Sequence, residues 1–327
     1  MASFLVVGGA GYIGSHVVKE LIAAGHEVIV LDDLSKGHRE AVAAGAFLEG
    51  DLGDHVLLDR IFSEQRIDCV MHFAAYSLVG ESVEDPLAYY DNNTGKTARL
   101  LTAMKVHGVL RFILSSTAAV YGEPEQIPIS ENASLDPTNP YGKSKLFIEK
   151  ILEDCDRAYG LKFTALRYFN AAGADESGEI GEDHELETHL IPLVLEVALG
   201  KRTHIDIYGT DWGTRDGTCV RDYVHVTDLG DAHILAAQRL MDGGSSAVYN
   251  LGCEKGYSVK EIVEVARKVT GHPIPVREAG RRPGDPERLV ASSEKIKSEL
   301  GWKPRFDDPE KIVATAWNWH RNHPGGF

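Results

Sequence analysis

The sequence predicts an α/β protein built on a doubly wound parallel sheet, with a smaller mixed α/β region toward its C-terminal end. A strand, a glycine-rich turn and a helix follow one another over residues 4–24. Further short apolar runs recur up to residue 166 at intervals that suit intervening helices, and this alternation stops after Gly173. Strands that alternate with helices over about 170 residues are typical of a parallel sheet covered on both faces.

The elements of the first half can be placed from apolar runs and helix-end signals. The first strand, residues 4–7, leads through the glycine turn into a helix that Gly25 ends. Later strands are expected at residues 27–31, 46–49, 69–73, 111–115 and 161–166. A helix that begins near residue 140 carries a helical apolar period as far as residue 152.

The second half of the chain lacks the regular alternation of strands and helices. Residues 174–187 are acidic and glycine-bearing without periodicity, which predicts a loop that could cover a site. Beyond it we expect helices at 190–199, 258–270, 293–300 and 309–321, strands at 205–208 and 247–251, and a strand edge with a helix at 224–241. The expected domains are residues 1–174, with 220–252 packed back onto them, and mainly residues 175–327.

Composition and charge exclude several classes of function. The 327 residues carry a formal charge of −15, which argues against a general binder of nucleic acid or of anionic membranes. Cys69, Cys155, Cys219 and Cys253 are far apart and lack CxxC spacing, so they suggest neither a disulfide framework nor a zinc site, and we expect no metal. The N-terminus does not resemble a secretory signal and no stretch reaches membrane-spanning length, which favours a cytoplasmic protein.

The glycine turn has the spacing Gly8-x-x-Gly11-x-x-Gly14 between a strand and a helix. Small residues at this place let the backbone approach a pyrophosphate, whose charge is favoured at a helix N-terminus. The turn therefore predicts a Rossmann-like, dinucleotide-binding site. The spacing differs from the commoner G-x-G form and points to a particular family.

Acidic residues end the second and third strands. Asp32, followed by Asp33, stands about twenty residues past the glycines, where a carboxylate can accept hydrogen bonds from the adenosine ribose. A 2′-phosphate would be repelled there, so the sequence favours NAD over NADP, although Lys36 and Arg39 lie nearby. The pair Asp51 and Leu52 is a candidate contact for adenine, but Asp51 could equally be a simple helix cap.

A second motif places a phenol and an ammonium four residues apart. Asn139 is a plausible N-cap and Pro140 suits the first helical position, so Tyr141 and Lys145 would share one helix face. A lysine beside a tyrosine lowers the pKa of the phenol and makes it a usable proton acceptor. On this pair alone, a boundary aromatic with a solvated lysine is the better interpretation.

The run from Ser115 to Gly122 presents three hydroxyls after a strand, at the carboxyl end where open α/β sheets bind ligands. Such hydroxyls are usually turn formers. Thr117 nevertheless precedes Tyr141 by 24 residues, and both segments would approach the same crevice. One of these hydroxyls could bridge Tyr141 and a substrate.

These motifs together resemble the extended short-chain dehydrogenases/reductases, which modify nucleotide sugars, and more narrowly the UDP-glucose 4-epimerases. The resemblance spans nearly the whole chain. It rests on the glycine turn with its continuation to His16, on Thr117 and Tyr141-x-x-x-Lys145, and on the strings at residues 72–75, 79–82, 89–93, 166–170, 217–225 and 281–285.

The resemblance implies reversible interconversion of UDP-galactose and UDP-glucose at C4, with bound NAD and with Tyr141 as acid/base. It implies that Lys145 and Thr117 assist Tyr141. The implied cofactor-binding residues are Gly8, Gly11, Tyr12, Ile13, Gly14, Asp32, Asp33, Asp51, Leu52, Phe73, Ala74, Ala75, Ser77, Asn92, Tyr141, Lys145 and Phe169. The implied substrate-binding residues are Thr117, Asn170, His189, Leu190, Tyr208, Arg221, Arg282, Asp285 and Leu289. Chemistry independently supports the roles of Arg221 and Arg282, because a diphosphate that binds an acidic protein needs permanently charged partners.

The chain departs from the family pattern at three places. Val7 replaces a Thr often found before the glycines, Ser77 stands where some epimerases carry a Lys, and Leu289 stands where a bulky Tyr can gate the 2-substituent of the sugar. UDP-N-acetylhexosamines are therefore possible further substrates. The resemblance also suggests a homodimer formed through the helices around residues 89–106 and 141–159.

Other functions stay open at this level. A 4,6-dehydratase typically needs Asp-Glu directly after the Thr, and here Ala118 and Ala119 follow Thr117. A uronate epimerase or an N-acetylglucosamine epimerase would share the fold and cofactor. A catalytically silent NAD-binding regulator is the alternative from a different class.

Overall fold

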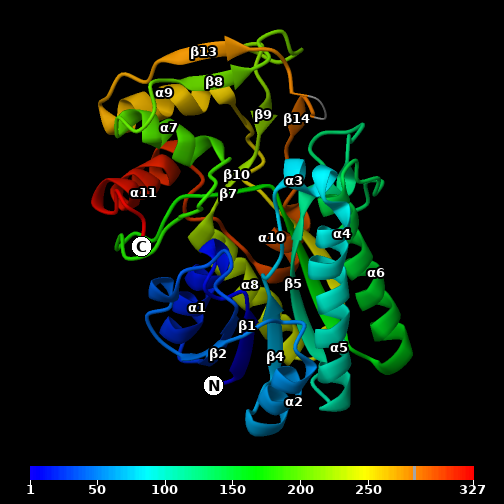
Figure 1. The fold of residues 1–327 in the computed structure, drawn as a ribbon. Helices are drawn as coiled ribbons and strands as arrows, with labels where there is room; N and C mark the ends of the chain where they lie inside the picture. The colour runs from blue at the N-terminus through cyan, green and yellow to red at the C-terminus, as the bar shows by residue number, and fades with distance from the viewer. Residues whose placement is uncertain (283–284) are drawn as a thin grey trace.

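A computed structural model of the chain describes residues 1–282 and 285–327. Its centre is a seven-stranded parallel sheet in the order β11-β6-β5-β4-β1-β2-β3 (Figure 1). The strands are β1 (Ser3–Val7), β2 (Glu27–Asp32), β3 (Ala46–Glu49), β4 (Cys69–His72), β5 (Arg111–Thr117), β6 (Lys162–Tyr168) and β11 (Ala247–Leu251). Because the order reverses between β1 and β4, the sheet is doubly wound, as predicted, and its switch point lies between these two strands.

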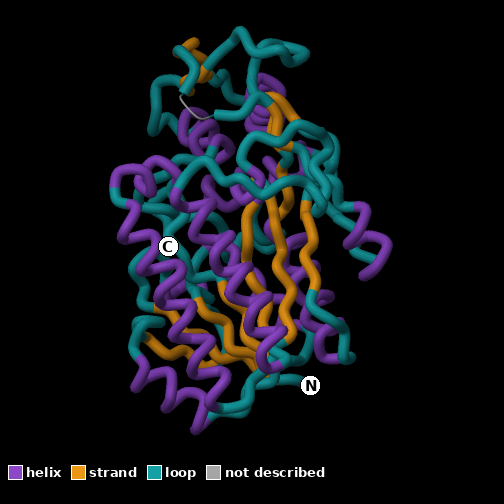
Figure 2. Tube along the Cα trace, turned by 90° about the vertical axis from the view of Figure 1, so that its right-hand side faces the viewer, coloured by secondary structure: helices purple, strands orange, loops and turns teal. Residues whose placement is uncertain are grey.

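Side chains of β1 alternate between two cores, one on each face of the sheet. Phe4 and Val6 face one core and Leu5 and Val7 the other. Figure 2 shows the strands running side by side among the covering helices. The first core is covered by α1 (Tyr12–Ala23), α8 (Val226–Met241) and α10 (Glu294–Leu300), and the second by α2 (His55–Glu64), α5 (Lys96–Val106) and α6 (Pro140–Tyr159).

A smaller group of elements lies beyond the carboxyl ends of the central strands, at the top of Figure 1. It has its own apolar core, which includes Ile191, Ile262 and Ile312. Its helices are α7 (Leu190–Ala198), α9 (Val259–Thr270) and α11 (Pro309–Asn322). Its short strands are β7 (Asn170–Ala172), β8 (Ile205–Tyr208), β9 (Val220–Arg221), β10 (Tyr223–His225), β12 (Tyr257–Ser258), β13 (Val276–Ala279) and β14 (Arg288–Leu289).

Most predicted elements are present within a few residues of their expected bounds. Asn139 caps α6 by accepting a hydrogen bond from the Gly142 amide, and Ser258 with Glu261 forms a capping box at α9. Several elements were not predicted, because their segments are short or polar. They are the short strands β7, β9, β12, β13 and β14, the helices α3 (Val79–Glu84) and α4 (Pro86–Tyr89), the π-helical η2 (Tyr90–Gly95), and the 3-10 turns η1 (Arg39–Ala41) and η3 (Ala118–Tyr121).

The acidic segment after Gly173 is a loop, as predicted, and it is held against α1. Lys19 in α1 binds both Asp175 and Glu179, with Nζ to oxygen distances of 2.7 and 2.8 Å. All four cysteines are free. Among the described helices, none has both the length and the apolar character needed to cross a membrane.

Two buried histidines make stability sensitive to acid. Burial lowers the pKa of His72 and of His225 to about 3. The Nδ1 atom of His225 accepts a hydrogen bond from the Thr227 amide at the start of α8, and only a ring unprotonated at Nδ1 can do so. Because the folded pKa is lower than the unfolded value, this stability is present above pH 6.5 and is lost as the pH falls toward 3.

We expect the free energy of unfolding to fall by about 2 kcal/mol per buried histidine between pH 7 and pH 5. Urea unfolding at the two values measures it. His225→Asn should reduce the dependence by about 2 kcal/mol, the contribution of His225, because asparagine can cap a helix without titrating. Exposed His272→Gln is the matched control and should leave it unchanged. An equally steep dependence in His225→Asn would contradict the assignment.

Candidate active site

The glycine turn joins β1 to α1 at the switch point of the sheet. Gly8 has φ of +80°, and a Cβ there would lie 2.4 Å from the Ala74 nitrogen, so only glycine fits. A Cβ on Gly14 would lie 2.1 Å from the Gly8 oxygen, which explains how closely α1 approaches the turn. Gly11 is different, because a Cβ there would meet its nearest neighbour at 3.6 Å. Its missing side chain instead leaves room in the adjoining pocket, as a cradle for a ligand requires.

Asp32, the last residue of β2, contacts the glycine turn through its carboxylate. One carboxylate oxygen accepts a hydrogen bond from the Ala10 amide and the other from the Leu34 amide, both at 2.9 Å. Burial raises the pKa of Asp32, and these two hydrogen bonds oppose the rise. The carboxylate therefore fixes the glycine turn to β2, and its remaining lone pairs can accept bonds from ribose hydroxyls.

A pocket lies at the carboxyl ends of β1, β2 and β4. The predicted cofactor residues that line it are Gly8, Gly11, Asp32, Asp33, Leu52, Phe73, Ala74, Ala75 and Asn92. Residues that were not predicted also line it, namely Val7, Leu31, Ser35, Lys36, Gly37, Gly50, Tyr76 and Lys96. A pocket at the switch point, with a glycine turn and a buried carboxylate, fits a dinucleotide.

Asp51 does not cap a helix. Its carboxylate binds Lys96, with a distance of 2.6 Å between oxygen and Nζ, whereas Asp54 caps α2. Burial acts to raise the pKa of Asp51, but the hydrogen bond from Lys96 holds the pKa below its usual range. Lys96 thereby brings an ammonium to the wall of the pocket. No pattern in the sequence marked Lys96, because its partner lies 45 residues away.

Thr117, Tyr141 and Lys145 meet at the carboxyl end of β5. Thr117 is the last residue of that strand, and its hydroxyl lies near enough to the Tyr141 phenol to lower the pKa of that group. Tyr141 is in the first turn of α6, and Lys145 one turn later donates a hydrogen bond of 2.9 Å to the Ser115 carbonyl. The strand end and the helix start therefore bring together the three residues that the sequence suggested.

Burial dominates the pKa values of Tyr141 and Lys145. Burial raises the pKa of Tyr141 above its usual value, and the nearby Thr117 hydroxyl opposes this rise only in part. Burial also lowers the pKa of the Lys145 ammonium to about 8, while the Glu149 carboxylate acts in the opposite direction. An acidic phenol therefore stays a prediction, because in this structure desolvation outweighs charge proximity.

Behind this site lies a buried charged network that sequence reasoning missed. Glu149 accepts hydrogen bonds from Ser116 and from Arg167, and the Arg167–Glu149 pair is almost fully buried. Arg167 also donates to the Tyr121 hydroxyl, which donates to Asn250. Glu149 follows Lys145 by four residues, so helical spacing could have revealed it.

Most predicted substrate residues gather at the small sheet around β9. Asp285 lies between two arginines, 2.9 Å from Arg282 Nε and 3.7 Å from Arg221 Nη2. The Arg282 guanidinium also lies over the Tyr208 ring, 4.7 Å from its centre. In β14, Leu289 pairs in register with Arg221, and the Asn170 amide bonds to the Asp222 carbonyl next to it. Two cations on one surface form a suitable site for a diphosphate.

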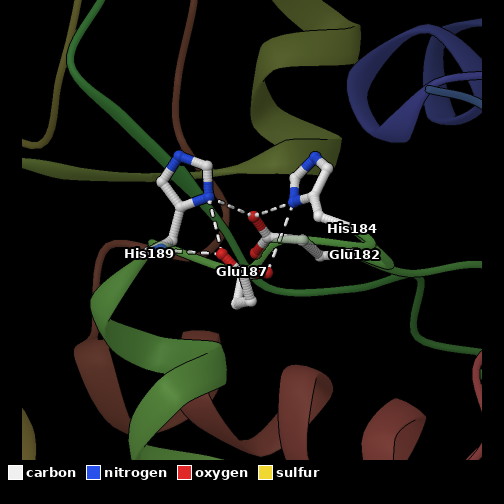
Figure 3. A group of neighbouring side chains, drawn as sticks. All are labelled: Glu182, His184, Glu187 and His189. Carbon is white, nitrogen blue, oxygen red and sulfur yellow. Dashed lines mark hydrogen bonds and ion pairs between the residues drawn. The ribbon is translucent and has the colours of Figure 1, made fainter. Parts of the chain in front are cut away.

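Other predicted residues face different surroundings. The Tyr12 hydroxyl donates to the Gly173 carbonyl at 2.6 Å, and Ile13 packs against the core below α1. Ser77 is exposed, and Phe169 and Leu289 both pack against a small apolar cluster that includes Tyr121. His189, followed by Leu190 at the start of α7, lies among the carboxylates of Glu182 and Glu187 (Figure 3).

Comparison with known proteins decides the family. Residues 4–252 match the NAD dependent epimerase/dehydratase family. The chain belongs to this family. It is 58% identical to a UDP-glucose 4-epimerase of Lacticaseibacillus casei over 323 residues, which is 98% of each chain.

Solved structures of UDP-glucose 4-epimerases agree with this assignment. One is 53% identical with a TM-score of 0.98, over 99% of each chain. That of Bifidobacterium longum, in complex with NAD+ and UDP, is 41% identical with a TM-score of 0.93, over 99% of this chain and 100% of the other. This epimerase/dehydratase family member therefore shares its whole length with UDP-glucose 4-epimerases, as the resemblance in the sequence indicated.

Proposed function

We propose that the chain interconverts UDP-galactose and UDP-glucose by reversible inversion at C4, through a transient 4-keto sugar and with tightly bound NAD. The gathering of Thr117, Tyr141 and Lys145 where β5 ends and α6 begins carries the proposal. A module that only bound NAD would need the pocket but no proton acceptor at this place. The full-length likeness to UDP-glucose 4-epimerases supports the same reaction.

Each residue has a distinct task. Tyr141, as phenolate, accepts the proton of the 4-hydroxyl and later returns it, and the Thr117 hydroxyl orients the reacting oxygen. Lys145, held by the Ser115 carbonyl, places a positive charge near the phenolate. When bound, NAD supplies the hydride acceptor and a cationic ring. Because the proton and the hydride both return to the sugar, the reaction consumes no NAD.

We assign the two ligands to different parts of the chain. Residues 1–174, onto which residues 220–252 pack back, hold NAD, and residues 175–327 mainly hold the UDP-sugar. Arg221 and Arg282 bind the diphosphate. In the structure both guanidinium groups are paired with the Asp285 carboxylate, which the diphosphate would replace. Tight binding of the UDP moiety, with weak binding of the sugar, lets the 4-keto sugar rotate. The hydride can then return to the opposite face of the sugar. We propose a cytoplasmic location, because four free cysteines are typical of a protein in a reducing compartment.

Incubation with UDP-galactose, without added NAD, tests this function. Chromatography of the products should show UDP-glucose at a ratio that is the same from either starting sugar. A 4-keto-6-deoxy product would identify a dehydratase, and turnover of UDP-glucuronate alone would identify a uronate epimerase. Absence of any product, with NAD still bound to the purified protein, would support a silent NAD-binding regulator.

We further propose that UDP-N-acetylhexosamines are accepted, because half-buried Leu289 stands where a bulky gate would exclude them. Leu289→Tyr should reduce turnover of UDP-N-acetylglucosamine by about tenfold or more while turnover of UDP-galactose persists, since steric exclusion acts on the 2-substituent alone. Steady-state kinetics with both substrates measures the difference. Leu289→Met keeps the volume and serves as the control. Wild-type protein without N-acetylhexosamine turnover would refute the proposal.

We also propose a homodimer that packs through residues 89–106 and 141–159. Apolar side chains on this face and on the adjoining α4 are exposed, with Leu87 at 76%, Val106 at 72% and Phe147 at 48%. Exposed apolar side chains distributed along these helices favour a protein interface. Phe147→Asp should convert the dimer to a monomer in light scattering after gel filtration. Val276→Asp, at an exposed apolar residue on β13, should leave the mass unchanged.

A further inference from the structure

The loop between β7 and α7 carries a compact group of four side chains that the proposed reaction does not use as a group. Glu182, His184, Glu187 and His189 each offer one ligand atom, and these atoms all lie within 4.8 Å of one another. Figure 3 shows both imidazoles directing Nδ1 toward the two carboxylates. Two imidazoles and two carboxylates form a donor set that binds zinc in proteins.

The distances within this group suit ligands that surround a common ion. His184 Nδ1 lies 3.4 Å from Glu182 Oε1 and 3.3 Å from Glu187 Oε2. His189 Nδ1 lies 2.8 Å from Glu182 Oε1 and 3.1 Å from Glu187 Oε1. In a tetrahedron with metal–ligand bonds of 2.0–2.1 Å, neighbouring ligand atoms are about 3.3 Å apart. Three of these distances are close to this value, but they involve both oxygens of Glu187, and the four ligand atoms lie up to 4.8 Å apart, so the group would contract around a bound ion.

Glu182 supplies a second observation. Its side chain is 4% exposed, and its Oε1 has no hydrogen-bond partner among the described residues although two imidazole nitrogens approach it. A buried carboxylate oxygen without a hydrogen bond is costly, so it requires an explanation. Glu187 differs, because its Oε1 accepts hydrogen bonds from the Thr188 and His189 amides. The unsatisfied oxygen of Glu182 faces the space between the imidazoles.

We propose that Glu182, His184, Glu187 and His189 form a structural site for a divalent cation, with zinc as the preferred ion. Four protein ligands complete a tetrahedron and leave no position for a substrate, which distinguishes such a site from a catalytic one. The cysteine spacing argued only against a zinc site built on cysteines, whereas the ligands in this loop are histidines and glutamates. Imidazole nitrogens favour zinc over magnesium or calcium, which prefer oxygen ligands alone.

A bound ion would link the loop to the N-terminal ends of α7 and α1. His189 is the N-cap of α7, and the His184 ring lies 6.3 Å from the ring of Tyr12, the first residue of α1. The Tyr12 hydroxyl in turn binds the Gly173 carbonyl, where the loop begins. The site therefore connects the start of α7 to the helix that follows the glycine turn.

Zinc binding to the full-length protein tests the proposal. After treatment with a chelator and dialysis, titration with Zn²⁺ alone should show one ion per chain by calorimetry, and Zn²⁺ should raise the melting temperature. Co²⁺ should give the intense visible absorption of a tetrahedral site. His184→Gln should weaken Zn²⁺ binding by at least about tenfold and abolish the absorption, because it removes a ligand.

Glu185→Gln is the matched control, because Glu185 is an exposed carboxylate between the proposed ligands. It should bind Zn²⁺ as the wild type does. If His184→Gln does not fold, as judged by circular dichroism, Glu187→Gln replaces it. Wild-type protein that binds no Zn²⁺, or binding that is equal in the wild type and the ligand variants, would overturn the site and leave four residues joined by ion pairs alone.

Discussion

Tyr141→Phe is expected to reduce the interconversion of UDP-galactose and UDP-glucose by a factor of about 10²–10⁴, because it removes the group that accepts and returns the 4-hydroxyl proton. The ring remains, so packing at the start of α6 should persist. The substitution removes the phenol hydroxyl that lies near Thr117. Steady-state kinetics, together with the NAD content of the purified variant, measures the effect.

Tyr159→Phe provides the control for this experiment, because Tyr159 is the last residue of the same helix and lies far along it from the site. It should retain full activity. Retained NAD and UDP binding in Tyr141→Phe would separate a loss of chemistry from a loss of binding. If Tyr141→Phe interconverts the sugars as fast as the wild type, the assignment of the acid/base is wrong.

Local signals predicted the central sheet well. Each strand from β1 to β6 is an apolar run, and Asn139 with Pro140 marks the start of α6. The glycine turn could be interpreted from spacing alone, because steric crowding at Gly8 and Gly14 is local to a strand–turn–helix unit. The same signals placed Thr117 and Tyr141 at one edge of the sheet.

Interactions between distant segments could not be predicted in this way. Lys96 binds Asp51, and Arg167 in β6 binds Glu149 in α6, without any periodicity that joins the partners. The direction of the Tyr141 pKa also depends on burial, which one motif does not report. The strand β9 has only two residues, so its pairing with β12 and β14 is set by tertiary packing around Asp222.

Glu149→Gln is expected to lower the free energy of unfolding by about 3–5 kcal/mol, because it leaves the buried Arg167 guanidinium without its counter-ion. Urea unfolding monitored by circular dichroism measures the loss. The double variant Glu149→Gln/Arg167→Met should recover most of the stability, since removal of both charges leaves no unpaired ion in the core. Equal losses in the single and double variants would show that shape, not charge, explains the effect.

The same two variants separate the structural role of Glu149 from its effect on the site. The Glu149 carboxylate raises the pKa of the Lys145 ammonium, which burial alone would lower further. Both variants lack this carboxylate, so Lys145 should lose its proton at a lower pH, and the alkaline limb of the activity profile should move to lower pH in both. Because the double variant regains stability without regaining the carboxylate, a persistent alkaline shift would identify Glu149 as a positioning residue for the charge on Lys145. An unshifted profile in the double variant would restrict Glu149 to the fold.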